Sequence, residues 1–145
     1  MLIQRVNRSD PEKIFVVVYN SYATAAITVG QCVVWDYTTD ADGVSVTEPS
    51  VALRSMIAGI VESTSIGAGG YGLIQVYGHN SNALVDGTTG IHVGAVLIPH
   101  TTTFNLTVMT TALDTFGAAC SFPITCGQTY TTGAAAAKKV FLRCL

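Results

Sequence analysis

The chain has 145 residues, of which 49% are hydrophobic and 11% are charged, whereas about 25% of the residues in an average soluble domain are charged. This length suits one compact domain with a substantial core. The weakly charged composition favours a protein that is packed into an assembly, or one adapted to conditions outside the cell. The net charge is −2, with no basic run longer than the Lys138-Lys139 pair, and the apolar stretches are interrupted by Thr, Gly and Pro, so nucleic-acid binding and a membrane-spanning helix are disfavoured.

Residues 1–12 differ in character from the rest of the chain. They carry Arg5, Arg8, Asp10 and Glu12, and they contain no apolar segment typical of a secretory signal. We therefore expect synthesis in a cytoplasm, with residues 1–12 forming an arm outside a single domain of residues 13–145. A first strand or a frayed terminus is an equally good interpretation. Within the arm, we assign partner binding to Leu2, Ile3, Gln4, Arg5, Val6, Asn7 and Arg8.

Short segments rich in β-branched and aromatic residues follow the arm, and turn residues separate them. They cover residues 13–21, 31–37, 55–63, 73–78, 92–99, 103–109 and 139–145. Helical signals are weak: Ser50 to Gly59 could open as a short turn, and residues 133–139 suit one helical turn or a loop. No linker and no repeat is identified. The pattern predicts an all-β fold, a small single-domain β-barrel or sandwich with glycine-rich hairpins and little helix.

The glycine cluster in "SIGAGGYGLIQVYG" places Gly67, Gly69 and Gly72 in the spacing of a dinucleotide fingerprint. That fingerprint binds a pyrophosphate only where the third glycine begins a helix. Here the segment after Gly72 is β-branched and aromatic, which predicts a strand. We therefore expect a hairpin loop between two strands, with no cofactor.

Metal-binding patterns are also incomplete. The stretch "WDYTTDADG" places Gly43 correctly for a calcium loop, but the twelfth position is Pro49 rather than a glutamate. An Asp-rich turn, in which carboxylates accept bonds from local amides, is the better interpretation. His79, His92 and His100, with Cys120 and Cys126, match no compact zinc spacing. We expect no metal site.

The four cysteines, at positions 32, 120, 126 and 144, include no C-x-x-C pair. In a protein without an export signal, reduced and buried thiols are the expected state. No nucleophile elbow and no pair of carboxylates facing a cleft is recognisable. The sequence therefore names no catalytic residue, and we expect a protein that is not an enzyme.

The order of segments carries a resemblance. "ITVGQCVVWD" is followed by the hairpin "IAGIVESTSIGAGGYGLIQVYG", then by "ALVDGTTGIHVGAVLIP" and a terminal "KKVFLRCL". Over residues 27–97 and the last strand, this resembles the small β-barrel head decoration, or cement, proteins of tailed bacteriophages. The segment from Thr101 to Thr132 is not part of the resemblance.

The resemblance implies a non-enzymatic virion protein that binds the outer face of an icosahedral capsid and stabilises it. Its expected partner is the major capsid protein, and it is expected to be a homo-oligomer, with a trimer favoured. No family residue can be assigned individually to this sequence. Two alternatives stay open: another virion component, such as a tail or fibre domain, and a glycan-binding β-sandwich. The glycan-binding alternative is less well supported, because Trp35 lies in an apolar strand where core packing is expected.

Overall fold

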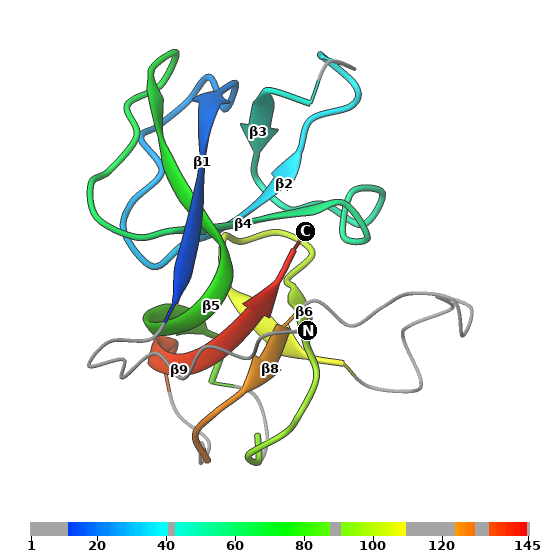
Figure 1. Cartoon of the computed structure of the whole chain (residues 1–145). Coiled ribbons are helices and arrows are strands. Elements are labelled where there is room, and N and C mark those ends of the chain that lie inside the picture. Colours follow the sequence, from blue (N-terminus) through cyan, green and yellow to red (C-terminus); the bar gives the residue numbers. More distant parts are fainter. Residues whose placement is uncertain (1–11, 41–42, 88–90, 110–123, 130–133, 145) are drawn as a thin grey trace, which may run out of the picture.

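The computed structural model describes residues 12–40, 43–87, 91–109, 124–129 and 134–144, and in this part the protein consists of strands and connections, without a helix (Figure 1). The all-β prediction is confirmed. The nine strands are β1 (Lys13–Asn20), β2 (Cys32–Trp35), β3 (Ser45–Thr47), β4 (Ile57–Val61), β5 (Tyr71–Val85), β6 (Leu97–Pro99), β7 (Leu106–Val108), β8 (Ile124–Cys126) and β9 (Ala136–Arg143).

All nine strands belong to one sheet, and the pairings in this sheet close into two rings that share β5. In the first ring, β1 pairs with β3, β3 with β2, β2 with β4, and β4 with β5, which returns to β1. In the second ring, β5 pairs with β9 and β7, β9 pairs with β8, and β7 pairs with β6. A bridge between Val96, just before β6, and Thr125 in β8 closes this ring. Figure 1 shows β1 to β4 in the upper part of the molecule and β6, β8 and β9 in the lower part.

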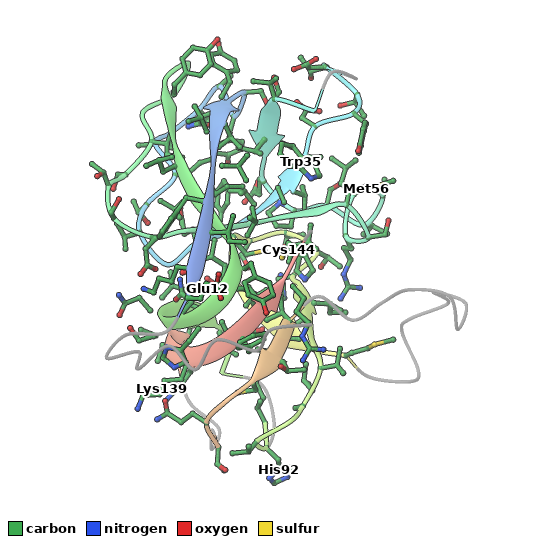
Figure 2. The ribbon with its side chains drawn as sticks, in the orientation of Figure 1. Glu12, Trp35, Met56, His92, Lys139 and Cys144 are labelled. Carbon is green, nitrogen blue, oxygen red and sulfur yellow. The ribbon has the colours of Figure 1, made fainter. Side chains whose placement is uncertain are left out.

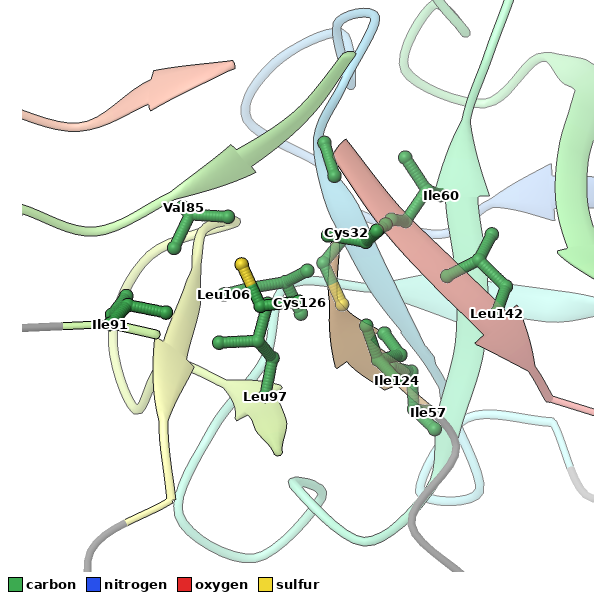
Figure 3. Packing of buried hydrophobic residues seen from close by; sticks show 12 residues of the cluster. Cys32, Ile57, Ile60, Val85, Ile91, Leu97, Leu106, Ile124, Cys126 and Leu142 are labelled. Atoms are coloured by element: carbon green, nitrogen blue, oxygen red, sulfur yellow. The ribbon is translucent and has the colours of Figure 1, made fainter. Parts of the chain in front are cut away.

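The buried hydrophobic side chains form two clusters, one centred in each ring, and β2 and β4 of the first ring also contribute Cys32, Ile57 and Ile60 to the second cluster. The first ring buries Val18, Ile27, Val33, Val46, Ala58, Val61, Ile66, Ile74, Val76 and Phe104. The second buries twelve residues that include Ile60, Val85, Leu97, Leu106, Ile124 and Leu142 (Figure 3). Trp35 is half-buried against the first cluster, as the sequence predicts. Because strand β5 contributes to both clusters, the two halves share a continuous backbone support.

The described residues contain three copies of one local motif, which was not expected as a repeat from the sequence. In each copy a fully buried isoleucine (Ile27, Ile66 or Ile91) is followed three residues later by a glycine with positive φ, at 86°, 68° and 85° in chain order. A backbone hydrogen bond closes each turn, from Gln31 to Thr28, from Gly70 to Gly67 and from Ala95 to His92. The third position of such a turn requires φ above zero, which explains the glycine.

Several elements differ from the expected ones. Residues 136–139, expected in a helical turn or a loop, belong to β9, because pairing of Ala136, Ala137 and Lys138 with β5 outweighs the helical preference of alanine. The segment after Pro49 forms turns with bonds from Leu53 to Ser50 and from Met56 to Leu53, and β4 then begins at Ile57. Strands β3 and β8 were not expected, since three residues are too few to produce a pattern.

Candidate functional site

The residues assigned to partner binding from the sequence, Leu2 to Arg8, lie outside the described residues. No helix in the described part of the chain is long and apolar enough to cross a lipid bilayer.

The glycine cluster is a hairpin connection, as predicted. Strands β4 and β5 pair antiparallel on either side of it, so no helix follows Gly72. The backbone N–H groups that would face a phosphate are already used: Gly69 donates to the Asn20 carbonyl at 3.0 Å, and Gly70 donates to the Gly67 carbonyl at 2.9 Å. A side chain at Gly72 would come within 2.4 Å of Ile66. The cluster therefore allows close packing of the loop on the first core.

The buried side chain of Asn20 binds this loop through hydrogen bonds. Its buried side-chain amide donates to the carbonyls of Ile66 and Gly67 at 3.0 and 3.1 Å and approaches that of Ala25 at 3.3 Å. Its side-chain oxygen accepts a bond from the Tyr22 N–H at 2.9 Å. The carbonyl groups of the glycine loop at Ile66 and Gly67 are thus bonded to the side-chain amide of Asn20.

The acidic stretch forms the Asp-rich turn that the sequence predicts. Asp36 accepts bonds from the Thr38 hydroxyl, the Thr39 N–H and the Ser21 hydroxyl. Burial favours the neutral form of Asp36, but these hydrogen bonds outweigh it and lower the pKa of the carboxyl group. The carboxylate therefore acts as a local acceptor that joins the end of β1 to the turn after β2.

The histidines and cysteines are not brought together into one centre. His79 lies in β5, His92 lies in the third glycine turn, and the His100 Nε2 lies 3.6 Å from an oxygen of Asp86. Among the described residues no group of three or more His, Cys, Asp or Glu side chains could hold a metal ion. Cys120 lies outside these residues.

The described cysteines are free thiols in apolar surroundings. Cys32 and Cys126 are buried (Figure 3). Cys144, labelled in Figure 2, is partly buried. Burial raises the pKa of Cys32 well above its usual value, and burial raises the pKa of Cys144 to about 12. Such thiols are poor nucleophiles at neutral pH, because the thiolate is the reactive form.

A buried polar network lies where β5 bends. Asn80 donates to Glu62 and to the Gln75 side chain, and Gln75 donates to the carbonyls of Tyr77 and His79. Lys13 contacts the same Glu62 carboxylate. These bonds satisfy the polar groups at the irregularity of the β5–β9 pairing between Asn80 and Ala83, so the network has a structural explanation.

The most prominent unexplained surface is an apolar face on β1 and β5. It consists of Phe15, Val17, Tyr19, Tyr71 and Leu73, hereafter the β1–β5 apolar face. Val17 lies opposite Leu73 and Tyr19 lies opposite Tyr71, with the two tyrosine rings 5.2 Å apart between centroids. The side chains are 42% (Phe15), 61% (Val17), 70% (Tyr71) and 44% (Leu73) exposed. A contiguous apolar face of this kind is typical of an interaction surface.

The sequence analysis missed this face for a physical reason. The segment "IFVVVY" is apolar at every position, so it lacks the alternation that would distinguish an inward from an outward side. The inward side is defined only by the partner elements, which bury Val18 and leave Val17 exposed. A run of this kind predicts a strand but does not say which residues face solvent.

Comparison with known proteins found no matching family model, no matching curated protein and no matching solved structure.

Proposed function

We propose that the protein is a non-enzymatic virion structural protein that binds the outer face of an icosahedral phage capsid and stabilises it, with the major capsid protein as its partner. The β1–β5 apolar face carries this proposal, because it is an exposed, uncharged surface on an all-β domain. The resemblance of residues 27–97 to head decoration proteins supports the choice of partner. The protein is further proposed to act on the virion surface as a homo-oligomer, with the arm Leu2–Arg8 as a second contact.

The energetics of such a contact follow from its composition. None of the five side chains of the β1–β5 apolar face is charged, so attachment depends on apolar burial, which salt does not screen. A protein that binds the assembled shell better than free subunits stabilises the shell by mass action, by about 2.7 kcal/mol per site at a free concentration a hundredfold above Kd. Summed over many sites on a shell, this increment is large.

The experiment adds purified protein to undecorated expanded shells and follows their heat disruption at low and high salt. We expect the disruption temperature to rise at both salts. Leu73→Ser removes an aliphatic side chain from the β1–β5 apolar face and should weaken attachment to the shell. Val93→Ser is the matched control, because Val93 is 66% exposed and is not part of this face. Absence of binding to shells under both conditions refutes the proposal and favours a tail or fibre component.

The glycan-binding alternative is less well supported by the surface. Tyr71 and Tyr19 are aromatic, but Val17 and Leu73 lie beside them. A sugar site combines a stacking ring with hydrogen-bonding side chains placed around it. The five residues of the face provide tyrosine hydroxyls and no carboxylate or amide.

A further inference from the structure

Along most of its length, one edge of β1 has no partner strand among the described residues. On one side β1 pairs with β5 from Lys13 to Tyr19, and on the other side it pairs with β3 through Tyr19 and Asn20. The N–H of Tyr19 points to β3, since it donates to the Val44 carbonyl at 2.9 Å. Because backbone groups alternate along a strand, those of Phe15 and Val17 also point away from β5. No strand in the described part of the chain pairs with them.

The open edge lacks the features that prevent pairing with another chain. Proteins protect such edges with prolines, charged side chains or bulges in the edge strand. From Ile14 to Tyr19 the strand has no proline and no charged residue, and Lys13 contacts the Glu62 carboxylate. The β1–β5 pairing is irregular between Ile14 and Phe15, but the extra residue, Val76, lies on β5 and not on β1. Ile14, Phe15 and Val17 are exposed beside the edge. With respect to the described part of the chain, the edge therefore presents unpaired backbone groups within an apolar, uncharged surface.

We propose that the open edge of β1 pairs with β1 of a second copy of this chain, antiparallel and about a two-fold axis at Phe15. In this register Phe15 lies opposite Phe15 of the second copy, and Lys13 lies opposite Val17. The pairing stays within Lys13–Val17, so it leaves Tyr19 and Asn20 with β3. A two-fold contact requires a self-complementary surface, and the apolar sequence from Ile14 to Val17 meets this requirement with one neutralised charge at its end.

This pairing goes beyond the proposed function and is compatible with it. Strand addition uses the backbone groups of the edge, so the side chains of Val17, Tyr71 and Leu73 remain outward. Two β1–β5 apolar faces then lie side by side as one larger surface. A two-fold contact produces even-numbered assemblies, which departs from the trimer that the resemblance favours.

The first experiment is sedimentation velocity of the full chain over a range of concentrations. We expect a reversible dimer. Val17→Pro removes an N–H that points away from β5, and proline is tolerated in an edge strand at such a position. The variant should therefore fold, but its dimer dissociation constant should rise by about tenfold or more. In Val16→Pro the lost N–H points toward β5, so this control should destabilise the fold itself.

The second experiment tests the register by disulfide trapping and does not depend on the proline variant folding. Opposite residues at the two-fold axis have Cα atoms about 5.5 Å apart, within the range of roughly 4.4–6.8 Å that a disulfide allows. Phe15→Cys should therefore form a covalent dimer under mild oxidation. The two copies of Val17 would be separated along the strands by about 13 Å, which is four residues at about 3.3 Å each. Val17→Cys and the wild-type protein should therefore not form a covalent dimer.

Three results overturn the proposal. They are a wild-type protein that stays monomeric at every concentration, a trimer that Val17→Pro leaves intact, and cross-linking of Val17→Cys as fast as that of Phe15→Cys. None of these measurements involves capsid shells, so failure of the pairing is distinguishable from failure of the proposed function.

Discussion

Replacing Asn20 by alanine tests whether this buried side chain holds the glycine loop on the first core. The amide of Asn20 has two hydrogens, which it directs at the carbonyls of Ile66 and Gly67, with that of Ala25 further away at 3.3 Å. Its oxygen accepts from the Tyr22 N–H. Asn20→Ala removes all of these bonds and keeps the strand in which Asn20 lies.

The expected loss follows from what each partner retains. The Ile66 carbonyl still accepts from the Ile27 N–H at 2.9 Å, and the Gly67 carbonyl still accepts from the Gly70 N–H at 2.9 Å, so neither is left without a donor. The Tyr22 N–H loses the bond to Asn20. With about 1 kcal/mol for each of three bonds, the free energy of unfolding should fall by about 2–3 kcal/mol. For a domain of this size, that corresponds to a fall in Tm of roughly 5–10 °C.

Urea unfolding, followed by tryptophan fluorescence at Trp35, measures the change directly. We expect a lower midpoint with an unchanged slope, and we expect the exposed-site control Asn82→Ala to stay within about 0.5 kcal/mol of the wild-type protein. Measurements at one low protein concentration keep self-association out of the comparison. A loss below about 0.5 kcal/mol for Asn20→Ala would show that the loop is held by its apolar contacts, and our account of Asn20 would be wrong.

Four further predictions follow from the site and the arm. Thiol titration of the denatured, non-reduced protein should find all four cysteines free, and four blocked thiols would contradict the expected reduced state. Burial raises the pKa of Cys144 to about 12 from 9.0, so between these values the folded state keeps a proton that the unfolded state releases. The contribution of Cys144 to the free energy of unfolding should therefore decline as pH rises from about 9 to 12. The hydrogen bonds of Asp36 lower its pKa from 3.8, so the ionised carboxylate should stabilise the fold above pH 3.8, and this stabilisation should be lost as pH falls through the lowered pKa. Asp36→Asn should flatten the acid dependence of the free energy of unfolding in urea titrations. An unchanged dependence would show that other carboxyl groups cause the loss of stability in acid. Removal of residues 1–8 should leave Tm nearly unchanged and weaken attachment to shells, whereas a collapse in Tm would identify these residues as an integral strand. Calorimetric titration with NAD or ATP should show no heat of binding, because the N–H groups of Gly69 and Gly70 are bonded within the loop; saturable binding that Gly69→Val abolishes would overturn this prediction.

The limits of the sequence prediction are clearest in β5. The sequence predicts a strand over residues 73–78, but β5 runs from Tyr71 to Val85 and continues through Gly78, His79, Asn80 and Ser81. These residues are typical of turns and gave no sign of a strand. The extension exists because Asn80 bonds to Gln75 and Glu62 and because β9 pairs along the same stretch. Those partners come from 5 to about 60 residues away in the chain, beyond the reach of any local pattern.

Local chemistry determined what could be predicted from the sequence alone. The β-branched density of residues 13–20 and 57–61 produced β1 and β4 near their observed bounds, and the strand after Gly72 excluded the helix that a nucleotide site requires. The acidic stretch formed an Asx-type turn because its own hydroxyl and amide donors lie within three residues of Asp36 or at Ser21 beside it in space. The tertiary structure alone decided that Val17 and Tyr71 face solvent, that Val18 faces the core, and that one edge of β1 lacks a partner strand among residues 12–40, 43–87, 91–109, 124–129 and 134–144. In an apolar run both sides of a strand have the same affinity for a core, so the side that is buried depends on which other strands close the ring.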